Sequence, residues 1–318
     1  MYKEKFFCPY RVCPLGAHID HQLGIVSGFA INKGIEIEYE KTDDGSISLS
    51  SNEFEKQVQF SLNKPIRKQG DWADYLRGAS VSLKRNHDLS YGVNAHVKGS
   101  LPIGGLSSSA AVIIAFLGVL CRANNIVLSK NEIVETALWA ETDFVGVKVG
   151  KLDQSCEVYS KQNHLLVIDT KDDSYELIAP HKDMPSFEIG IFFSGLERNL
   201  VGSKFNMRVD ELKSAAYALK AFSGMEYGKF DETVLRDVPK EVFEKYKDKL
   251  PLNWAKRAEH YYSEFERVSM GAKAWREGDL EKFGSLTFQS GDSSIYNYEA
   301  GSVQLKKIHE ILPRGSML

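Results

Sequence analysis

The stretch that most constrains the fold is the run LPIGGLSSSAA at residues 101–111, where glycines and three serines lead into a mostly apolar segment. Small residues let a backbone approach an oxyanion closely. The first turn of a helix has unpaired amide groups and a partial positive charge. The run therefore predicts a phosphate-binding loop before a buried helix over 110–123, unless the serines serve only as helix caps.

The run differs from the two most familiar nucleotide-binding loops. The chain contains no Gly-x-x-x-x-Gly-Lys-Ser/Thr sequence, and no lysine follows these glycines. The spacing is also not that of the dinucleotide-binding glycine motif. If the loop binds phosphate, it belongs to another class of nucleotide-binding protein.

Composition narrows the class of protein further. A chain of 318 residues favours two domains, and 43% hydrophobic with 26% charged residues is ordinary for a globular protein. The net charge of −3, without a Lys/Arg block, argues against nucleic-acid and membrane partners. The four cysteines have neither zinc-ligand nor disulfide spacing, so we expect reduced thiols. No apolar run resembles a signal sequence or a membrane span, so we expect a cytoplasmic protein.

The hydrophobic pattern indicates both strands and helices. Alternation predicts an antiparallel hairpin of residues 35–39 and 46–49, and Ser129 with Glu132 predicts a capping box for a helix over 131–142. Further strands are expected at 93–98, 164–169 and 187–193, and further helices at 71–86, 208–222, 254–275 and 280–290. The acidic turn and prolines within 170–185 suggest a domain boundary.

Three stretches together carry a family resemblance. They are PYRVCPLGAHIDH at 9–21, PIGGLSSSAA at 102–111 and AETDFVGVKVGKLDQ at 140–154, with weaker agreement at 71–75 and 257–268. In this order they resemble the GHMP small-molecule kinases and, within them, the galactokinase-type sugar kinases. The resemblance implies an α+β fold with an S5-like domain over 1–175 and a ferredoxin-like domain over 176–318. The second domain is expected to be truncated, because the sequence lacks the family's third, glycine-rich motif.

The resemblance assigns the glycine-serine run to ATP. The residues expected to bind the nucleotide are Pro102, Gly104, Gly105, Leu106, Ser107, Ser108, Ser109 and Ala110. A hydroxyl of Ser108 or Ser109 and the carboxylate of Glu141 are expected to hold Mg²⁺, which prefers hard oxygen donors.

The same resemblance makes Asp153 the carboxylate that takes the proton from the anomeric hydroxyl of the sugar, with Arg11 beside it. This pairing is chemically reasonable, since a guanidinium stabilises a neighbouring carboxylate and is not itself deprotonated. Phosphoryl transfer depends mainly on alignment and on positive charge around the moving group. The residues expected to contact the sugar are Ala17, His18, Asp20, Gly150 and Lys151.

One departure from the family pattern points to the substrate. Galactokinases have Gly-Glu-His-x-Asp where this chain has Gly16-Ala17-His18-Ile19-Asp20. If the sugar has a carboxylate at C6, alanine removes a repulsion between two negative charges. The longer stretch PYRVCPLGAHIDH at 9–21, followed by AINKGI at 30–35, resembles galacturonokinases, which act on D-galacturonate at C1.

We therefore expect an ATP-dependent uronic-acid 1-kinase, a monomer or weak dimer whose partners are a small sugar and ATP. Lys151, Arg198 and Arg208 are the candidate partners of the sugar carboxylate. The alternatives are a galactokinase proper and a catalytically silent sugar-binding or regulatory protein on the same fold.

Overall fold

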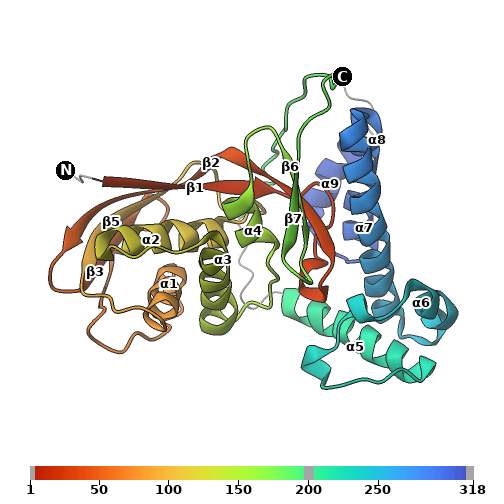
Figure 1. Cartoon of the computed structure of the whole chain (residues 1–318), viewed down its shortest axis with the longest axis horizontal. Helices are drawn as coiled ribbons and strands as arrows, with labels where there is room; N and C mark the ends of the chain where they lie inside the picture. The colour runs from red at the N-terminus through yellow and green to blue at the C-terminus, as the bar shows by residue number, and fades with distance from the viewer. Residues whose placement is uncertain (1–3, 197–203, 313–318) are drawn as a thin grey trace. The chain divides into compact units, whose positions relative to one another are not determined.

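The computed structural model describes residues 4–196 and 204–312 (Figure 1). By their internal contacts these residues form two compact units. The first contains residues 4–12 and 30–159, and the second contains residues 13–29, 160–196 and 204–312. The division is interleaved along the chain, and the family-type boundary after residue 175 stays a prediction.

The first unit is built on a sheet with the strand order β4-β3-β5-β2, in which β1 also pairs with β2. Strand β3 runs parallel to β5, with Ile47 opposite Val93, and β5 runs antiparallel to β2, with Ile37 opposite Val97. Alternate side chains of these strands are buried, as a period of two requires. The strands are β1 (Glu4–Val12), β2 (Ile25–Thr42), β3 (Ser46–Ser51), β4 (Val58–Ser61) and β5 (Gly92–Gly99).

The hairpin predicted for residues 35–39 and 46–49 is wrong in its pairing. Both segments are strands, but β5 lies between them in the sheet order. The turn at Asp43–Gly45 joins the two strands in sequence, but they do not pair with each other. Strand β5, which follows α1 (Asp74–Lys84) in the chain, inserts between them and pairs with both. A local turn signal cannot report such a long-range insertion.

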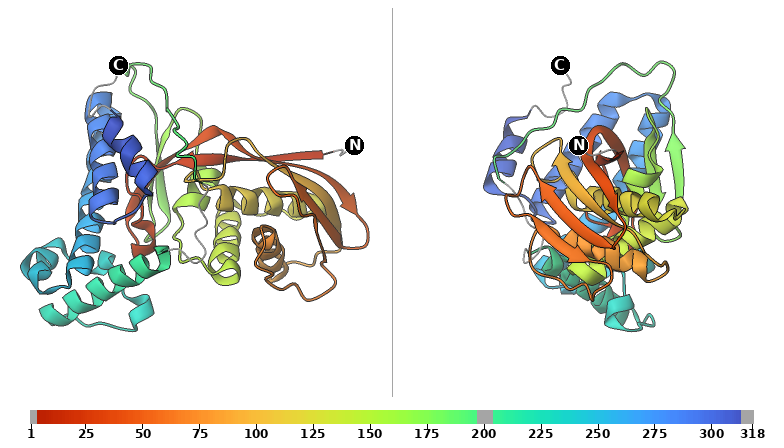
Figure 2. Two further views of the ribbon diagram at one scale, coloured as in Figure 1. Left: turned by 180° about the vertical axis from the view of Figure 1, so that it is seen from behind. Right: turned by 90° about the vertical axis from the view of Figure 1, so that its left-hand side faces the viewer.

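Helices cover one face of this sheet, as Figure 2 shows for α1, α2 and α3. Their apolar faces and the strands form one core, in which Ile37, Leu49, Leu76 and Phe116 are almost fully buried. The capping box at Ser129 and Glu132 is confirmed, with both reciprocal hydrogen bonds present. The further helical elements of this unit are α2 (Ser108–Asn124), α3 (Lys130–Trp139), the π-helical turn η2 (Ala140–Val145) and α4 (Leu152–Tyr159).

The second unit is mainly helical. Residues 25–28 of β2 pair with β6 (Leu165–Asp169), and β6 pairs with β7 (Ser174–Ile178). The long helices α7 (Leu252–Glu277) and α8 (Leu280–Tyr296) lie side by side (Figures 1 and 2) and bury Trp275 and Leu286. The remaining elements are η1 (Asp20–Gln22), α5 (Phe205–Ser223), η3 (Phe230–Glu232), η4 (Leu235–Asp237), α6 (Lys240–Tyr246), η5 (Lys247–Lys249) and α9 (Val303–Ile311).

The strand predicted for 187–193 is not formed. These residues are neither helix nor strand, and Ile189, Phe192 and Phe193 are 44%, 61% and 48% exposed. An apolar sequence becomes a strand only when a neighbouring strand accepts its hydrogen bonds, and among the described residues none pairs with this segment. Apolar composition alone was therefore misleading here.

The α+β fold class is confirmed. Cys8, Cys13, Cys121 and Cys156 are free thiols, as the sequence predicts. Within residues 4–196 and 204–312, no helix has the length and apolar character needed to cross a membrane.

Candidate active site

The glycine-serine loop precedes α2 as predicted, although the helix begins earlier, at Ser108. Ser107 occupies the N-cap position with a left-handed φ of 66° and makes no capping hydrogen bond with its side chain. Gly105 also has a positive φ, 68°, and a Cβ there would meet open space. The interpretation that Ser107 is a simple side-chain cap is therefore not supported, because its hydroxyl bonds none of the amides of the first turn.

Arg11 joins two parts of the predicted site. From the end of β1, its Nε donates to Asp153 Oδ1 at 2.8 Å and its Nη2 lies 2.7 Å from the same oxygen. Its Nη1 donates to the carbonyl of Gly105 at 3.0 Å, and its backbone N–H donates to the carbonyl of Leu106 at 3.3 Å. One side chain thus connects the first turn of α4 with the phosphate loop.

Glu141 lies in the π-helical turn η2, a type of helix insertion that often occurs at functional sites. Its side chain is buried, and Gln154 Nε2 donates to its Oε2 at 2.8 Å. Burial is the main reason that the pKa of Glu141 rises to about 7, with the negative charge of Asp153 adding to the effect. A hydrogen bond from the Ser109 side chain acts in the opposite direction.

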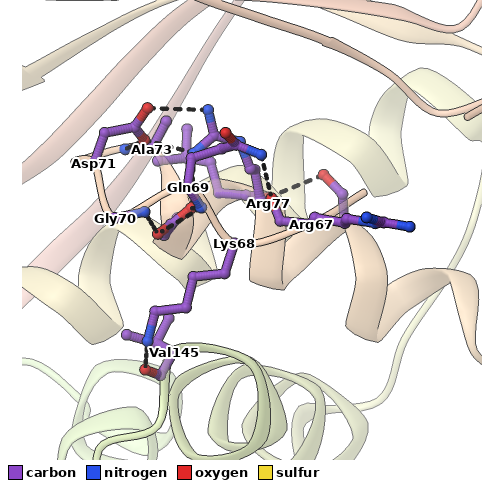
Figure 3. Close-up of polar contacts among 11 residues, drawn as sticks. Arg67, Lys68, Gln69, Gly70, Asp71, Ala73, Arg77 and Val145 are labelled. Atoms are coloured by element: carbon purple, nitrogen blue, oxygen red, sulfur yellow. Dashed lines mark hydrogen bonds and ion pairs between the residues drawn. The ribbon is translucent and has the colours of Figure 1, made fainter. Parts of the chain in front are cut away.

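A charged cluster at the start of α1, together with the loop before it, supports the turn that carries Glu141 (Figure 3). Arg77 Nη1 donates to Asp71 at 2.5 Å and to Asp74 at 2.7 Å, and Asp74 also accepts the backbone N–H of Gly70 at 2.7 Å. The same loop sends the Lys68 ammonium to the carbonyl of Val145, the last residue of η2. The cluster therefore fixes the start of α1, and Lys68 of the adjoining loop holds the end of η2.

The residues around Glu141 fit a magnesium ion. Glu141 and the Ser109 hydroxyl offer hard oxygen donors, and a buried carboxylate gains from a cation that offsets its charge. Across the described ranges, no three or more His, Cys, Asp or Glu side chains are grouped to hold a metal by themselves. A magnesium ion held here would therefore depend on further oxygen ligands, such as those of a nucleotide phosphate.

The second unit contains the predicted sugar motif at residues 16–20. Gly16 N–H donates to Glu264 Oε2 at 2.8 Å, and His260 Nε2 donates to the carbonyl of Ala17 at 2.9 Å. The His18 backbone has a φ of 65°, and its ring stacks on Tyr298 with the centroids 4.4 Å apart. Helix α7 therefore holds this stretch in a conformation that non-glycine residues seldom adopt.

The remaining site candidates have mixed environments. Asp20 is 9% exposed at the start of η1, and Gly150 is partly exposed between η2 and α4. Lys151 pairs with Glu135 at 2.6 Å, and Arg208 Nη2 donates to the carbonyl of Glu299 at 2.7 Å. Arg198 lies outside the described residues.

Some supporting residues were not singled out from the sequence. Gln154 holds Glu141, and His260 and Glu264 hold the sugar motif from positions four apart on α7. The segment 257–268 had drawn attention only as a weak resemblance, although the spacing of His260 and Glu264 places them on one helix face. Nothing in the sequence marks Glu157 of α4 as a site residue, because its burial depends on the tertiary structure.

Comparison with known proteins gives consistent results. The family "GHMP kinases N terminal domain" matches residues 74–161. The chain is 39% identical to galacturonokinase of Arabidopsis thaliana, with 96% of this chain and 76% of that protein covered. It is 32% identical to galactokinase of Thermotoga neapolitana, with 96% and 81% covered.

Solved structures show the same likeness. Lactococcus lactis galactokinase complexed with galactose matches with a TM-score of 0.87 and 28% identity, over 96% of this chain and 78% of that one. Methanococcus jannaschii mevalonate kinase matches with a TM-score of 0.59 and 17% identity, over 97% and 83%, which indicates a shared fold.

Proposed function

Because this chain belongs to the GHMP kinase family, within its galactokinase-like sugar kinases, we propose that it transfers the γ-phosphoryl group of ATP to the anomeric hydroxyl of a hexuronic acid. D-galacturonate is the favoured acceptor, and galacturonate 1-phosphate the product. We further propose that the enzyme is cytoplasmic, which agrees with its free thiols.

The observation that carries this proposal is the position of Arg11. Its guanidinium contacts Asp153 and the phosphate loop at the same time. A base that is fixed relative to the bound phosphates is what an in-line transfer requires, because the attacking oxygen and the phosphorus must be aligned. In this role Asp153 accepts the proton of the anomeric hydroxyl, and Arg11 adds positive charge near the transferring group.

The phosphate loop is proposed to bind ATP through its amides, with Ser108 or Ser109 and Glu141 as the protein ligands of Mg²⁺. When bound, the ion neutralises charge on the phosphate oxygens. The protein side of this arrangement is the buried Glu141, which Gln154 orients. The raised pKa of Glu141 means that binding a cation there is coupled to release of a proton near neutral pH.

The preference for a uronate rests on Ala17. Its carbonyl is held by His260, so the backbone position is fixed and only a methyl group replaces the glutamate of galactokinases. His18 and Asp20 are proposed to bind sugar hydroxyls, for which imidazole and carboxylate groups are suitable partners. The likeness to a protein named galacturonokinase supports the same choice.

The direct test is ADP formation with Mg-ATP and a panel of acceptors, including D-galacturonate, D-glucuronate and D-galactose. We expect ADP release with galacturonate and little with galactose. Turnover of galactose alone would favour a galactokinase proper. Sugar binding without ADP formation would favour the catalytically silent sugar-binding or regulatory protein, which the paired Arg11 and Asp153 argue against.

A further inference from the structure

Helix α4 carries a second buried carboxyl group besides Asp153. Glu157 follows Asp153 by four residues, so both side chains lie on one face of the helix. Glu157 is 7% exposed, and its Oε1 atom is buried without a hydrogen-bond partner among the described residues. Its Oε2 atom is 4.0 Å from the Cys8 thiol. Such a group is rarely left unsatisfied in a protein interior.

A second unsatisfied polar atom lies nearby, at the start of α2. Ser107 is 7% exposed, and within the described parts of the chain its Oγ has no hydrogen-bond partner. This hydroxyl lies close enough to Glu157 to lower the pKa of that carboxyl, by less than burial raises it. Its backbone is left-handed, a conformation that needs support from its surroundings in a non-glycine residue.

The surroundings favour the neutral form of Glu157. Burial is the largest cause of its strongly raised pKa, and the charges of Asp153 and Glu141 add to it. Arg11 and, more weakly, the Ser107 hydroxyl lower this pKa, but their effects are smaller than that of burial, and the Arg11 guanidinium is already bonded to Asp153 and Gly105. The other titratable groups facing Glu157 are Cys8 and Tyr10 of β1, which carry no positive charge and whose own pKa values are raised by burial.

We propose that Glu157 is a positioning residue that, as a neutral carboxyl group, donates its proton in a hydrogen bond to Ser107 Oγ. This single bond satisfies both buried atoms and ties the phosphate loop to the helix that carries Asp153. The inference rests on the proposed kinase function, since it assigns the bond to the alignment of bound ATP. Asp153 and Arg11 act on the reacting groups, whereas Glu157 acts only through the loop.

The test compares Glu157→Leu, Glu157→Gln, Ser107→Ala and the Glu157→Leu/Ser107→Ala pair. The readouts are the Kd of a non-hydrolysable ATP analogue by calorimetry and the separate KM values for ATP and sugar. We expect Glu157→Leu and Ser107→Ala each to weaken nucleotide binding about tenfold, as loss of one buried hydrogen bond would. The KM for the sugar should change less than about twofold.

Two further results are expected from a real bond between these residues. Glu157→Gln should recover most of the loss seen with leucine, because an amide can also donate to the serine oxygen. The double variant should bind the ATP analogue no more weakly than either single variant, because both substitutions remove the same interaction. Asp88→Asn, the same change from carboxylate to amide at an exposed position of the first unit, is the matched control.

Several outcomes would overturn the inference. Nucleotide binding by Glu157→Leu equal to that of the parent would show that the carboxyl does not act on the loop. A loss with glutamine as large as with leucine would show that the charged form is required, and additive losses in the pair would show that no bond joins the residues. Failure of the parent chain itself to bind nucleotide would contradict the proposed function instead.

Discussion

At the scale of single residues, the feature with the largest consequence is the Arg11 side chain. It gives two of its nitrogens to Asp153 and a third to the Gly105 carbonyl. A lysine at this position has a single ammonium group and cannot reproduce that planar set of donors. Alignment of the base with the phosphate loop therefore depends on arginine specifically.

Replacing Asp153 with asparagine should leave nucleotide affinity within about twofold but lower kcat by about 10²- to 10⁴-fold, the usual contribution of a general base. The amide keeps the shape of the side chain and cannot accept the proton. Initial rates of ADP release, together with calorimetric binding of an ATP analogue, measure both effects. An Asp153→Asn enzyme with near-normal kcat would remove Asp153 from the catalytic role.

Glu141 makes a separate prediction about stability and pH. Its pKa is raised to about 7 in the folded protein from 4.5, so the folded state holds a proton that the unfolded chain releases. Stability is therefore lost as pH rises from about 4.5 to about 7, by an amount on the order of 3 kcal/mol when about 1.4 kcal/mol is counted per pKa unit. Glu141→Gln should remove this penalty.

Thermal unfolding without nucleotide or Mg²⁺ provides the measurement. At pH 8 the Glu141→Gln variant should have a higher Tm than the parent, whereas at pH 4.5 the two should nearly coincide. Asp88→Asn should show no such pH-dependent difference. An equal effect of Glu141→Gln at both pH values would mean that the carboxyl is not held neutral by burial.

At the scale of elements, helix α1 begins in a nearly buried ion cluster. The side chains of Arg77 and Asp74 are 6% and 5% exposed, and Asp71 completes the group. Removing the guanidinium that bonds both Asp71 and Asp74 would leave two poorly solvated carboxylates, a change that costs about 3 kcal/mol or more. Arg77→Met should therefore lower the urea midpoint markedly, and an unfolding free energy within about 0.5 kcal/mol of the parent would contradict the importance of the cluster.

Ser129→Ala is a useful comparison on α3. It removes one half of the capping box and should cost about 1 kcal/mol, clearly less than Arg77→Met. The same urea titration ranks the two variants. A larger loss from the cap than from the ion cluster would mean that solvent screens the Arg77 interactions more than their burial indicates.

Elements defined by local signals could be predicted well from the sequence. The capping box, the apolar pattern of α2 and the glycine-serine loop each depend on neighbouring residues, and each is present. The insertion of β5 between β2 and β3 and the missing strand at 187–193 depend on which distant strands pair. No local pattern carries that information.

The site residues also divide into those that local motifs predict and those that depend on long-range contacts. Arg11, Asp153 and Glu141 stand in motifs that resemble a known family, and the structure brings Arg11, Asp153 and the phosphate loop together. Glu157 and His260 act through burial and tertiary contacts, which a single sequence does not reveal. Their roles can be inferred only from the structure, which shows their burial and their contacts with distant residues.

At the scale of the whole molecule, each unit carries a different set of the proposed functional residues. The first carries Arg11, Glu141, Asp153 and the phosphate loop, and the second carries the sugar motif at residues 16–20. The proposed chemistry of phosphoryl transfer is therefore assigned to the first unit. The proposed choice of sugar through Ala17 is assigned to the second, while the sugar-contact candidates Gly150 and Lys151 lie in the first. A substitution at residue 17 should alter acceptor preference with little effect on nucleotide binding.

The central claim is that this kinase acts on a uronate, and the ratio of kcat/KM for D-galacturonate to that for D-galactose tests it most directly. The parent chain should favour galacturonate at least about tenfold, and Ala17→Glu should reduce that preference by about tenfold or more, through repulsion between two carboxylates. Ala17→Gln is the matched control, because it adds similar bulk without charge. Equal or better use of galactose by the parent, or an unchanged ratio in Ala17→Glu, would contradict the account.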